Sequence, residues 1–147
     1  MCTSFLFNWN AKKIDPAEKA LLYSHIYSYG SVKTVVHWFQ IMRSRKFQMY
    51  DDYQECNTGD EYSGQVPPVY HTNQINCPVA LFYGSSDTLP NIKSIIKDLN
   101  PDKLVHVEEV REYEHLDFMW AKDVHKTVYP RLLEVLKHPQ NSTVASQ

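Results

Sequence analysis

The chain has 147 residues, which is enough for one domain with a sizeable hydrophobic core. Fifteen Lys and Arg face seventeen Asp and Glu, giving a net charge of −2, and this balance argues against nucleic acid, which is usually met by a basic face. No apolar run reaches the roughly eighteen residues that a membrane-spanning helix needs.

Two amphipathic helices are predicted in the first third of the chain. Asp15, Pro16 and Glu18 form the capping signature of the first helix, and Gly30 supplies its stop. Ser31 caps the second helix, whose apolar residues recur at helical spacing: Val32, Val35, Val36, Phe39 and Met42. We expect these helices to bury their apolar stripes against each other or against a missing partner.

Residues 51–76 form a connection between the two halves of the chain. The stretch "DDYQECNTGDEYSGQVPPVYHTNQIN" is acidic, rich in Gly, Asn and Pro, and has no sustained period. It also contains Pro67-Pro68, which favours a stiff extended piece. We therefore predict a boundary between subdomains here.

The second half of the chain is predicted to be a strand, a helix, a second strand and a final helix. The run 79–83 is apolar on both faces, as in buried parallel strands. A helix over 92–99, capped by Asn91, separates it from a second strand over 104–107. A helix between two strands makes the strands parallel. The final helix should run from about 121 to 137, interrupted or kinked at Pro130, followed by a loose tail.

Two candidate site residues follow these strands. Asp87 comes four residues after the first strand, and His115 lies in the loop after the second. Parallel strands bring their carboxyl ends to one edge of a sheet, so the carboxylate can come within hydrogen-bond reach of the imidazole. The carboxylate would then orient the ring, leaving the other ring nitrogen as a general base. Alternatively, Asp87 only closes a turn through its own backbone.

The order Asp then His matches the last two members of an α/β-hydrolase triad. Four stretches extend this match to a family: "LFNW" at 6–9, "SVKTVVHWFQIMRSRKFQMYDD" at 31–52, "PPVYHTNQINCPVALFYGSSDTL" at 67–89 and "EYEHLDFMWAKDVHKTVYPRLLEVL" at 112–136. Through them the chain resembles the carboxyl-terminal part of the acid lipases, the group of gastric and lysosomal lipases, and most of all fungal steryl ester hydrolases.

This resemblance implies an α/β fold, a carboxyl-terminal βαβα fragment of an α/β-hydrolase preceded by cap helices. Residues 1–75 would be the last part of the helical cap with its connecting loop, 76–138 the end of the hydrolase core, and 139–147 a flexible tail. Asp87 would be the triad acid and His115 the triad histidine. The substrate would be a neutral lipid ester, either a steryl ester or a triacylglycerol.

One departure separates the chain from the acid lipases. Their nucleophile is the Ser of a GxSxG elbow, and this sequence contains no such motif. We therefore expect a fragment of a lipid ester hydrolase that carries Asp and His without the nucleophile, with the missing amino-terminal part of the fold as a partner. The alternatives are an inactive lipase remnant that binds lipid or a partner chain, and an unrelated α/β module in which Asp87 and His115 are structural.

No cofactor and no metal ion are predicted. Three cysteines without a CxxC pair fit neither a disulfide framework nor a zinc site: Cys2, Cys56 and Cys77. His106 and Glu108 share a face of the second strand, but His115 lies beyond it. We expect no secretory signal at the amino end of this sequence, and the triplet at Asn141 is a weak glycosylation pattern. The compartment stays open, since relatives of the acid lipase group are bound to membranes or lipid droplets, or are lysosomal or vacuolar.

Overall fold

The computed structural model describes residues 10–26, 29–52 and 66–138. The described residues fall into two compact units, which divide after residues 26 and 71. Some predictions lie outside the described residues: the loose tail after Pro139, most of the connection after residue 52, Cys2, Cys56 and Asn141. The division of the chain into cap (1–75) and core (76–138) stays a prediction.

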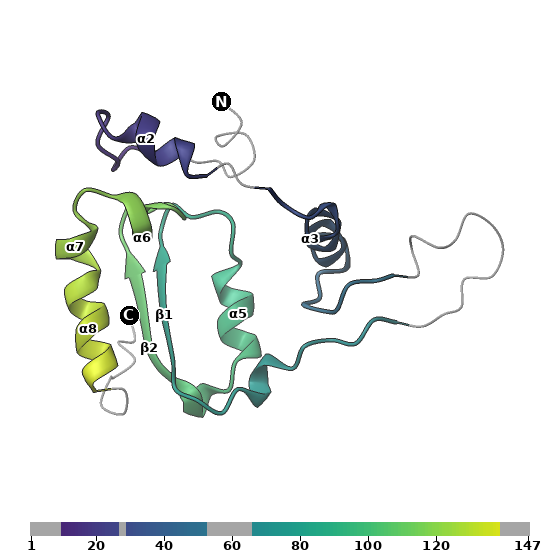
Figure 1. Ribbon diagram of the computed structural model, residues 1–147. Helices are drawn as coiled ribbons and strands as arrows, with labels where there is room; N and C mark the ends of the chain where they lie inside the picture. The colour runs from purple at the N-terminus through teal and green to yellow at the C-terminus, as the bar shows by residue number, and fades with distance from the viewer. Residues whose placement is uncertain (1–9, 27–28, 53–65, 139–147) are drawn as a thin grey trace. The chain divides into compact units, whose positions relative to one another are not determined.

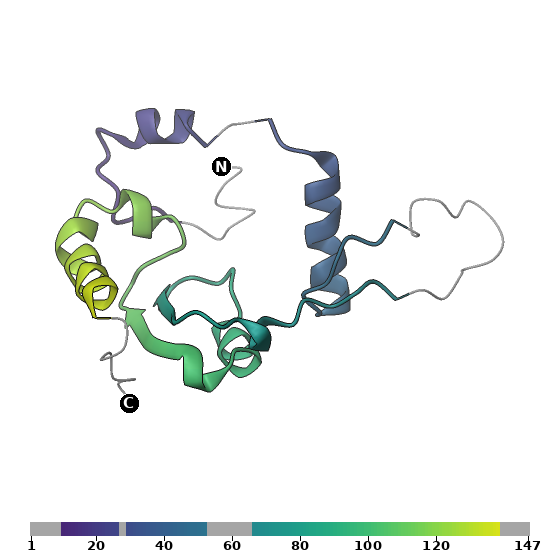
Figure 2. The same cartoon turned by 60° about the horizontal axis from the view of Figure 1, so that its bottom comes forward.

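The first unit is built on two parallel strands, as the sequence predicts (Figure 1). Strand β1 (Val79–Gly84) and strand β2 (Leu104–Val110) pair in register from Ala80 opposite His106 to Gly84 opposite Val110. Helix α5 (Ile92–Asp98) connects them, and the side chain of Asn91 caps it by accepting a hydrogen bond from Ser94 N at 3.2 Å. In Figures 1 and 2 the strands lie between α5 and α8 (Tyr129–Lys137), so a helix covers each side of the pair.

Short 3₁₀ turns lead into both strands. They are η1 (Thr72–Gln74) before β1 and η2 (Pro101–Lys103) directly before β2. The hydroxyl of Thr72 donates a hydrogen bond to Asp98 O at 3.1 Å, which ties the first turn to the end of α5. The amino ends of the two strands are therefore connected through α5 and its flanking turns.

The helix predicted over 121–137 is divided into separate pieces. Within this range lie α7 (Val124–Thr127) and α8, which begins directly after Val128, while the one-turn helix α6 (Asp117–Trp120) precedes the range. Pro130 sits in the first turn of α8, where its missing N–H has no intrahelical partner to lose. The predicted interruption is therefore present, and it falls at Val128, two residues before the proline. The core of the unit lies where these helices meet the strands: Val110, Tyr113, Ala121, Val124 and Val128, with Phe82 and Phe118 packed against them.

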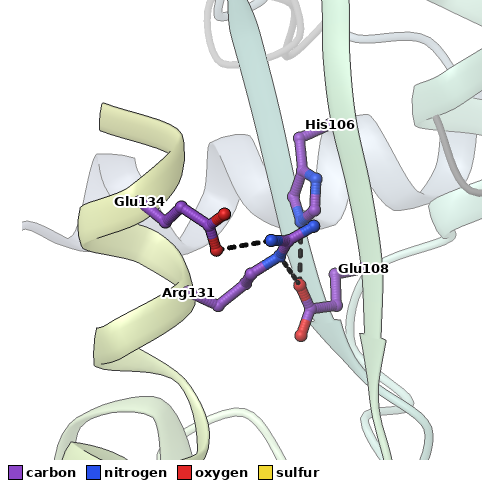
Figure 3. Close-up of polar contacts among 4 residues, drawn as sticks. All are labelled: His106, Glu108, Arg131 and Glu134. Carbon is purple, nitrogen blue, oxygen red and sulfur yellow. Dashed lines mark hydrogen bonds and ion pairs between the residues drawn. The ribbon is translucent and has the colours of Figure 1, made fainter. Parts of the chain in front are cut away.

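Polar side chains join α8 to β2 (Figure 3). His106 is buried, and its Nε2 lies 2.8 Å from the Glu108 carboxylate. The guanidinium of Arg131 on α8 lies 3.5 Å from the same carboxylate and also pairs with Glu134. The shared face of His106 and Glu108 therefore serves the docking of α8.

The first predicted helix is shorter than its capping pattern suggested. Helix α2 (Lys19–Ser24) begins four residues after Asp15, whose carboxylate accepts a hydrogen bond from Ala17 N at 2.9 Å in a local turn. Glu18 stands at the N-cap without a side-chain cap bond, so the predicted capping box does not form. Competition from the Asp15 turn delays the helix start.

The second unit consists of α3 (Val32–Ser44) and a short antiparallel bridge between Gln48 and Val69. His37 on α3 contacts Gln48 O at 2.7 Å through Nε2, which ties this helix to the bridge residue Gln48. Gln40 exchanges two hydrogen bonds with the backbone of Asp51, at 3.0 and 2.9 Å. The apolar stripe of α3 is exposed rather than buried: Val32, Val35, Phe39 and Met42.

Candidate active site: the Asp87–His115 pair

The loops after β1 and β2 bring Asp87 and His115 into contact. Asp87 ends a tight turn in which its N–H donates to Gly84 O at 3.1 Å, directly after β1. His115 lies five residues after the end of β2. His115 Nδ1 lies 2.9 Å from Asp87 Oδ2. The predicted hydrogen bond between the two candidate residues is therefore present.

The two partners differ in their exposure to solvent. The side chain of Asp87 is 5% exposed, and its second oxygen, Oδ1, accepts a hydrogen bond from Leu89 N at 3.0 Å. The side chain of His115 is 54% exposed. An ionised carboxylate only accepts hydrogen bonds, so Nδ1 carries the proton and Nε2 of neutral His115 is left with its lone pair. This arrangement suits a general base that faces outward.

Backbone contacts hold the two loops together. Ser85 N donates to Val110 O at 3.0 Å, and Ser86 N donates to Tyr113 O at 3.1 Å. The hydroxyl of Ser85 accepts a hydrogen bond from Glu112 N at 2.8 Å. Gly84 makes this approach possible, because a Cβ atom there would lie 2.0 Å from Tyr113 O. The sequence indicated Gly84 only as the exit of a strand.

Two further carboxylates lie beside His115 in the chain. Asp117 is 1% exposed, and its Oδ2 accepts a hydrogen bond from Glu114 N at 2.8 Å. Burial away from water raises the pKa of Asp117 above its usual value. Its Oδ1 is buried without a partner among the described residues. No role was predicted for Glu114 or Asp117 from the sequence, and no local pattern indicates the burial of either carboxylate.

Tyr113, the residue before Glu114, fixes the same loop to the hydrophobic core. Its ring is buried against Phe118, and its hydroxyl donates a hydrogen bond to Asp123 at 2.8 Å. Burial raises the pKa of Tyr113 to about 12, with the Asp123 carboxylate adding to the rise. Tyr113 therefore stays neutral at physiological pH and acts as a support for the loop.

The Asp87–His115 pair can orient an imidazole and take up a proton, but hydrolysis of an ester also needs a nucleophile. The 147 residues contain no GxSxG elbow. In the described ranges, no group of three or more His, Cys, Asp and Glu is placed to hold a metal ion. No described helix combines the length and the hydropathy needed to cross a membrane.

Comparison with known proteins relates the chain to lipases. It is 41% identical over 135 residues to a probable lipase of Schizosaccharomyces pombe, and 29% identical over 141 residues to human gastric triacylglycerol lipase. It is also 27% identical over 136 residues to the lysosomal acid lipase/cholesteryl ester hydrolase of Macaca fascicularis. No family model matches the chain.

These similarities cover most of this chain but only part of each relative. They span 90%, 92% and 92% of the chain, and 30%, 35% and 34% of the relatives, in the same order. The chain thus corresponds to about a third of the length of the lipases that it matches.

Proposed function

Because this chain belongs to the acid lipase family, we propose that it is the part of a lipid ester hydrolase that supplies the acid and the histidine of a Ser-Asp-His triad. Asp87 is the triad acid and His115 is the proton shuttle. The observation that carries this proposal is the 2.9 Å contact between His115 Nδ1 and the nearly buried Asp87 carboxylate.

The geometry leads to a simple division of roles. The Ser hydroxyl comes from the remainder of the lipase fold, which this chain does not span. His115 Nε2 takes the hydroxyl proton while the Ser oxygen attacks the ester carbonyl, and it then gives the proton to the departing alcohol oxygen. Asp87 stays ionised, holds Nδ1–H and stabilises the imidazolium. A water molecule later releases the acyl group by the same proton transfers in reverse order.

The substrate in this proposal is a neutral lipid ester, a steryl ester or a triacylglycerol. The matching relatives include proteins named as a triacylglycerol lipase and as a cholesteryl ester hydrolase. Under the same proposal, residues 1–75 belong to the cap and residues 76–138 to the core of the α/β-hydrolase fold.

A chimera tests the proposal. Residues 10–138 of this chain replace the matching segment of the S. pombe probable lipase, whose own ester hydrolysis is measured first. We expect the chimera to hydrolyse a short-chain ester. His115→Ala should reduce kcat at least about a thousandfold, because members of a triad act as a unit. His125→Ala, which removes an exposed histidine of α7, is the matched control and should leave kcat unchanged.

The same experiment decides between this proposal and its alternative. The alternative is an inactive lipase remnant that binds lipid or a partner chain. A folded chimera without hydrolysis, next to an active parent, would support the remnant. Equal activity of the chimera and its His115→Ala variant would overturn the assignment of His115.

A further inference from the structure

Residues 111–116, between β2 and α6, form the loop that carries His115, called the His115 loop below. The carboxylate of Glu114 in this loop contacts residues that lie far away in the sequence. It accepts hydrogen bonds from Asn10 N at 2.9 Å and Ala11 N at 3.0 Å on one oxygen, and from Asn10 Nδ2 at 2.9 Å on the other. Glu114 is 8% exposed, and more than one hundred residues separate it from its donors in the sequence. Three donors on one buried carboxylate form a specific attachment.

This attachment constrains the backbone at both of its ends. Ala11 has a φ of 54°, a left-handed conformation that an alanine adopts at a cost. Its N–H in this conformation points at Glu114. On the other side, Glu114 N is held by the buried carboxylate of Asp117 at 2.8 Å. Glu114 is therefore fixed through its main chain and through its side chain.

The residue after His115 is fixed by the same segment. Leu116 and Trp120 pack against Ala11 and Ile14, which are both 2% exposed. His115 itself is half exposed, and its one hydrogen bond among the described residues goes to Asp87. The orientation of its ring consequently depends on how firmly its two neighbours are held.

We propose that Glu114 is a positioning residue, whose carboxylate ties residues 10–11 to the His115 loop and thereby keeps the imidazole directed at Asp87. This inference rests on the proposed function for its importance, because a proton shuttle works only in one orientation.

Three variants of the full 147-residue chain separate the contributions. Glu114→Ala removes the whole attachment. Glu114→Gln preserves it, because its Oε1 can accept from both backbone N–H groups while its amide pairs with a turned Asn10 amide. Glu112→Ala is the matched control. It removes a nearby acid whose side chain is 71% exposed and whose ion pair with Lys13 Nζ is long, at 3.8 Å.

The readout is the tautomer of His115, measured by ¹⁵N NMR of the imidazole nitrogens and assigned with His115→Ala. In the parent chain, a hydrogen bond to a carboxylate should favour the Nδ1–H form by about tenfold. We expect the ratio of the Nδ1–H to the Nε2–H tautomer of His115 in Glu114→Ala to fall to the ratio in a free imidazole side chain. Glu114→Gln and Glu112→Ala should retain it. Hydrogen exchange at the amides of Asn10 and Ala11 should accelerate only in Glu114→Ala.

A role in stability alone predicts a different outcome. Glu114→Ala would then lower the midpoint of urea unfolding and leave the His115 tautomer of the folded molecules unchanged, which would overturn the inference. If Glu114→Ala fails to fold, Asn10→Ala removes a single one of the three bonds. It should give a smaller change of the tautomer preference, and no change would equally refute the proposal.

These outcomes are distinguishable from a failure of the proposed function. Suppose that Glu114→Ala loses the tautomer preference while His115→Ala leaves the activity of the chimera unchanged. Glu114 is then a positioning residue, but the assignment of His115 as a proton shuttle is wrong. An unchanged tautomer, together with a chimera that needs His115, retains the hydrolase and removes Glu114 from it.

Discussion

Gly84→Ala should separate the two loops that carry Asp87 and His115. An added Cβ would lie 2.0 Å from Tyr113 O and 2.6 Å from the carbonyl carbon, and both are backbone atoms that no rotamer change can move aside. Carbon and oxygen approach to about 3.3 Å at the closest, so the loops must move apart by about 1.3 Å. Applied to the 2.9 Å contact between His115 and Asp87, this displacement ends their hydrogen bond.

The cost in stability follows from the same contacts. Overpacking costs about 1–3 kcal/mol. The hydrogen bonds of Ser85 N and Ser86 N to the facing loop add about 1 kcal/mol each when they break. A loss of about 3–5 kcal/mol is a large share of the total stability of an ordinary domain. The free energy of unfolding is measured by urea titration of the parent chain and of Gly84→Ala.

Gly30→Ala provides the control for Gly84→Ala. Apart from its chain neighbours, no atom of the described residues lies within 4 Å of a Cβ at Gly30, so this variant removes a glycine without a clash there. We expect it to change the free energy of unfolding by less than about 1 kcal/mol. Equal stabilities of the two alanine variants, with the His115 tautomer unchanged in both, would refute the steric argument.

Three further predictions concern single side chains of the loops. Asp87→Asn should lower kcat of the chimera by about 10⁴, because the amide favours the wrong tautomer of His115; a loss below tenfold would contradict this. Ser85→Ala should lower the free energy of unfolding by about 0.5–1.5 kcal/mol, because its hydroxyl no longer accepts the hydrogen bond from Glu112 N. Ser86→Ala, whose hydroxyl has no hydrogen bond among the described residues, should lower it less, and urea titration measures both. Asp117, with its raised folded pKa, holds its proton more tightly in the folded chain, so its contribution to stability is largest below its usual pKa of 3.8 and is lost as pH rises through the folded pKa. Stability curves of Asp117→Asn between about pH 4 and 7 should therefore fall less steeply than those of the parent, and parallel curves would contradict this.

The sheet and the Asp87–His115 contact could be predicted because they depend on local patterns. An apolar run of strand length, a helical period over 92–99 and a second short run are sufficient to indicate a parallel pair. The meeting of the two loops then follows from the direction of the strands. The same patterns locate α3 and its first residue correctly.

The supports of the site could not be predicted from local patterns. Glu114 and Asn10 are 104 residues apart, and nothing in the neighbourhood of either residue indicates the other. The close approach at Gly84 depends on where Tyr113 O lies, and the sequence shows only a glycine after a strand. By contrast, a break of the last helix near Pro130 could be predicted, and it falls at Val128, two residues before the proline.

The contacts that place Asp87 against His115 also close the carboxyl end of the two-stranded sheet. Ser85 N bonds to the last residue of β2, Val110, and Ser86 N to Tyr113 in the core. A variant that weakens these contacts therefore lowers stability and disturbs the pair together, so unfolding data alone cannot assign a role to any loop residue. Glu114 is the informative exception, because its donors lie in residues 10–11 and outside the sheet. The informative result would be a Glu114 variant in which the His115 tautomer changes while amide hydrogen exchange in β1 and β2 does not. It would show that residues 10–11, rather than the strands, orient His115 toward Asp87.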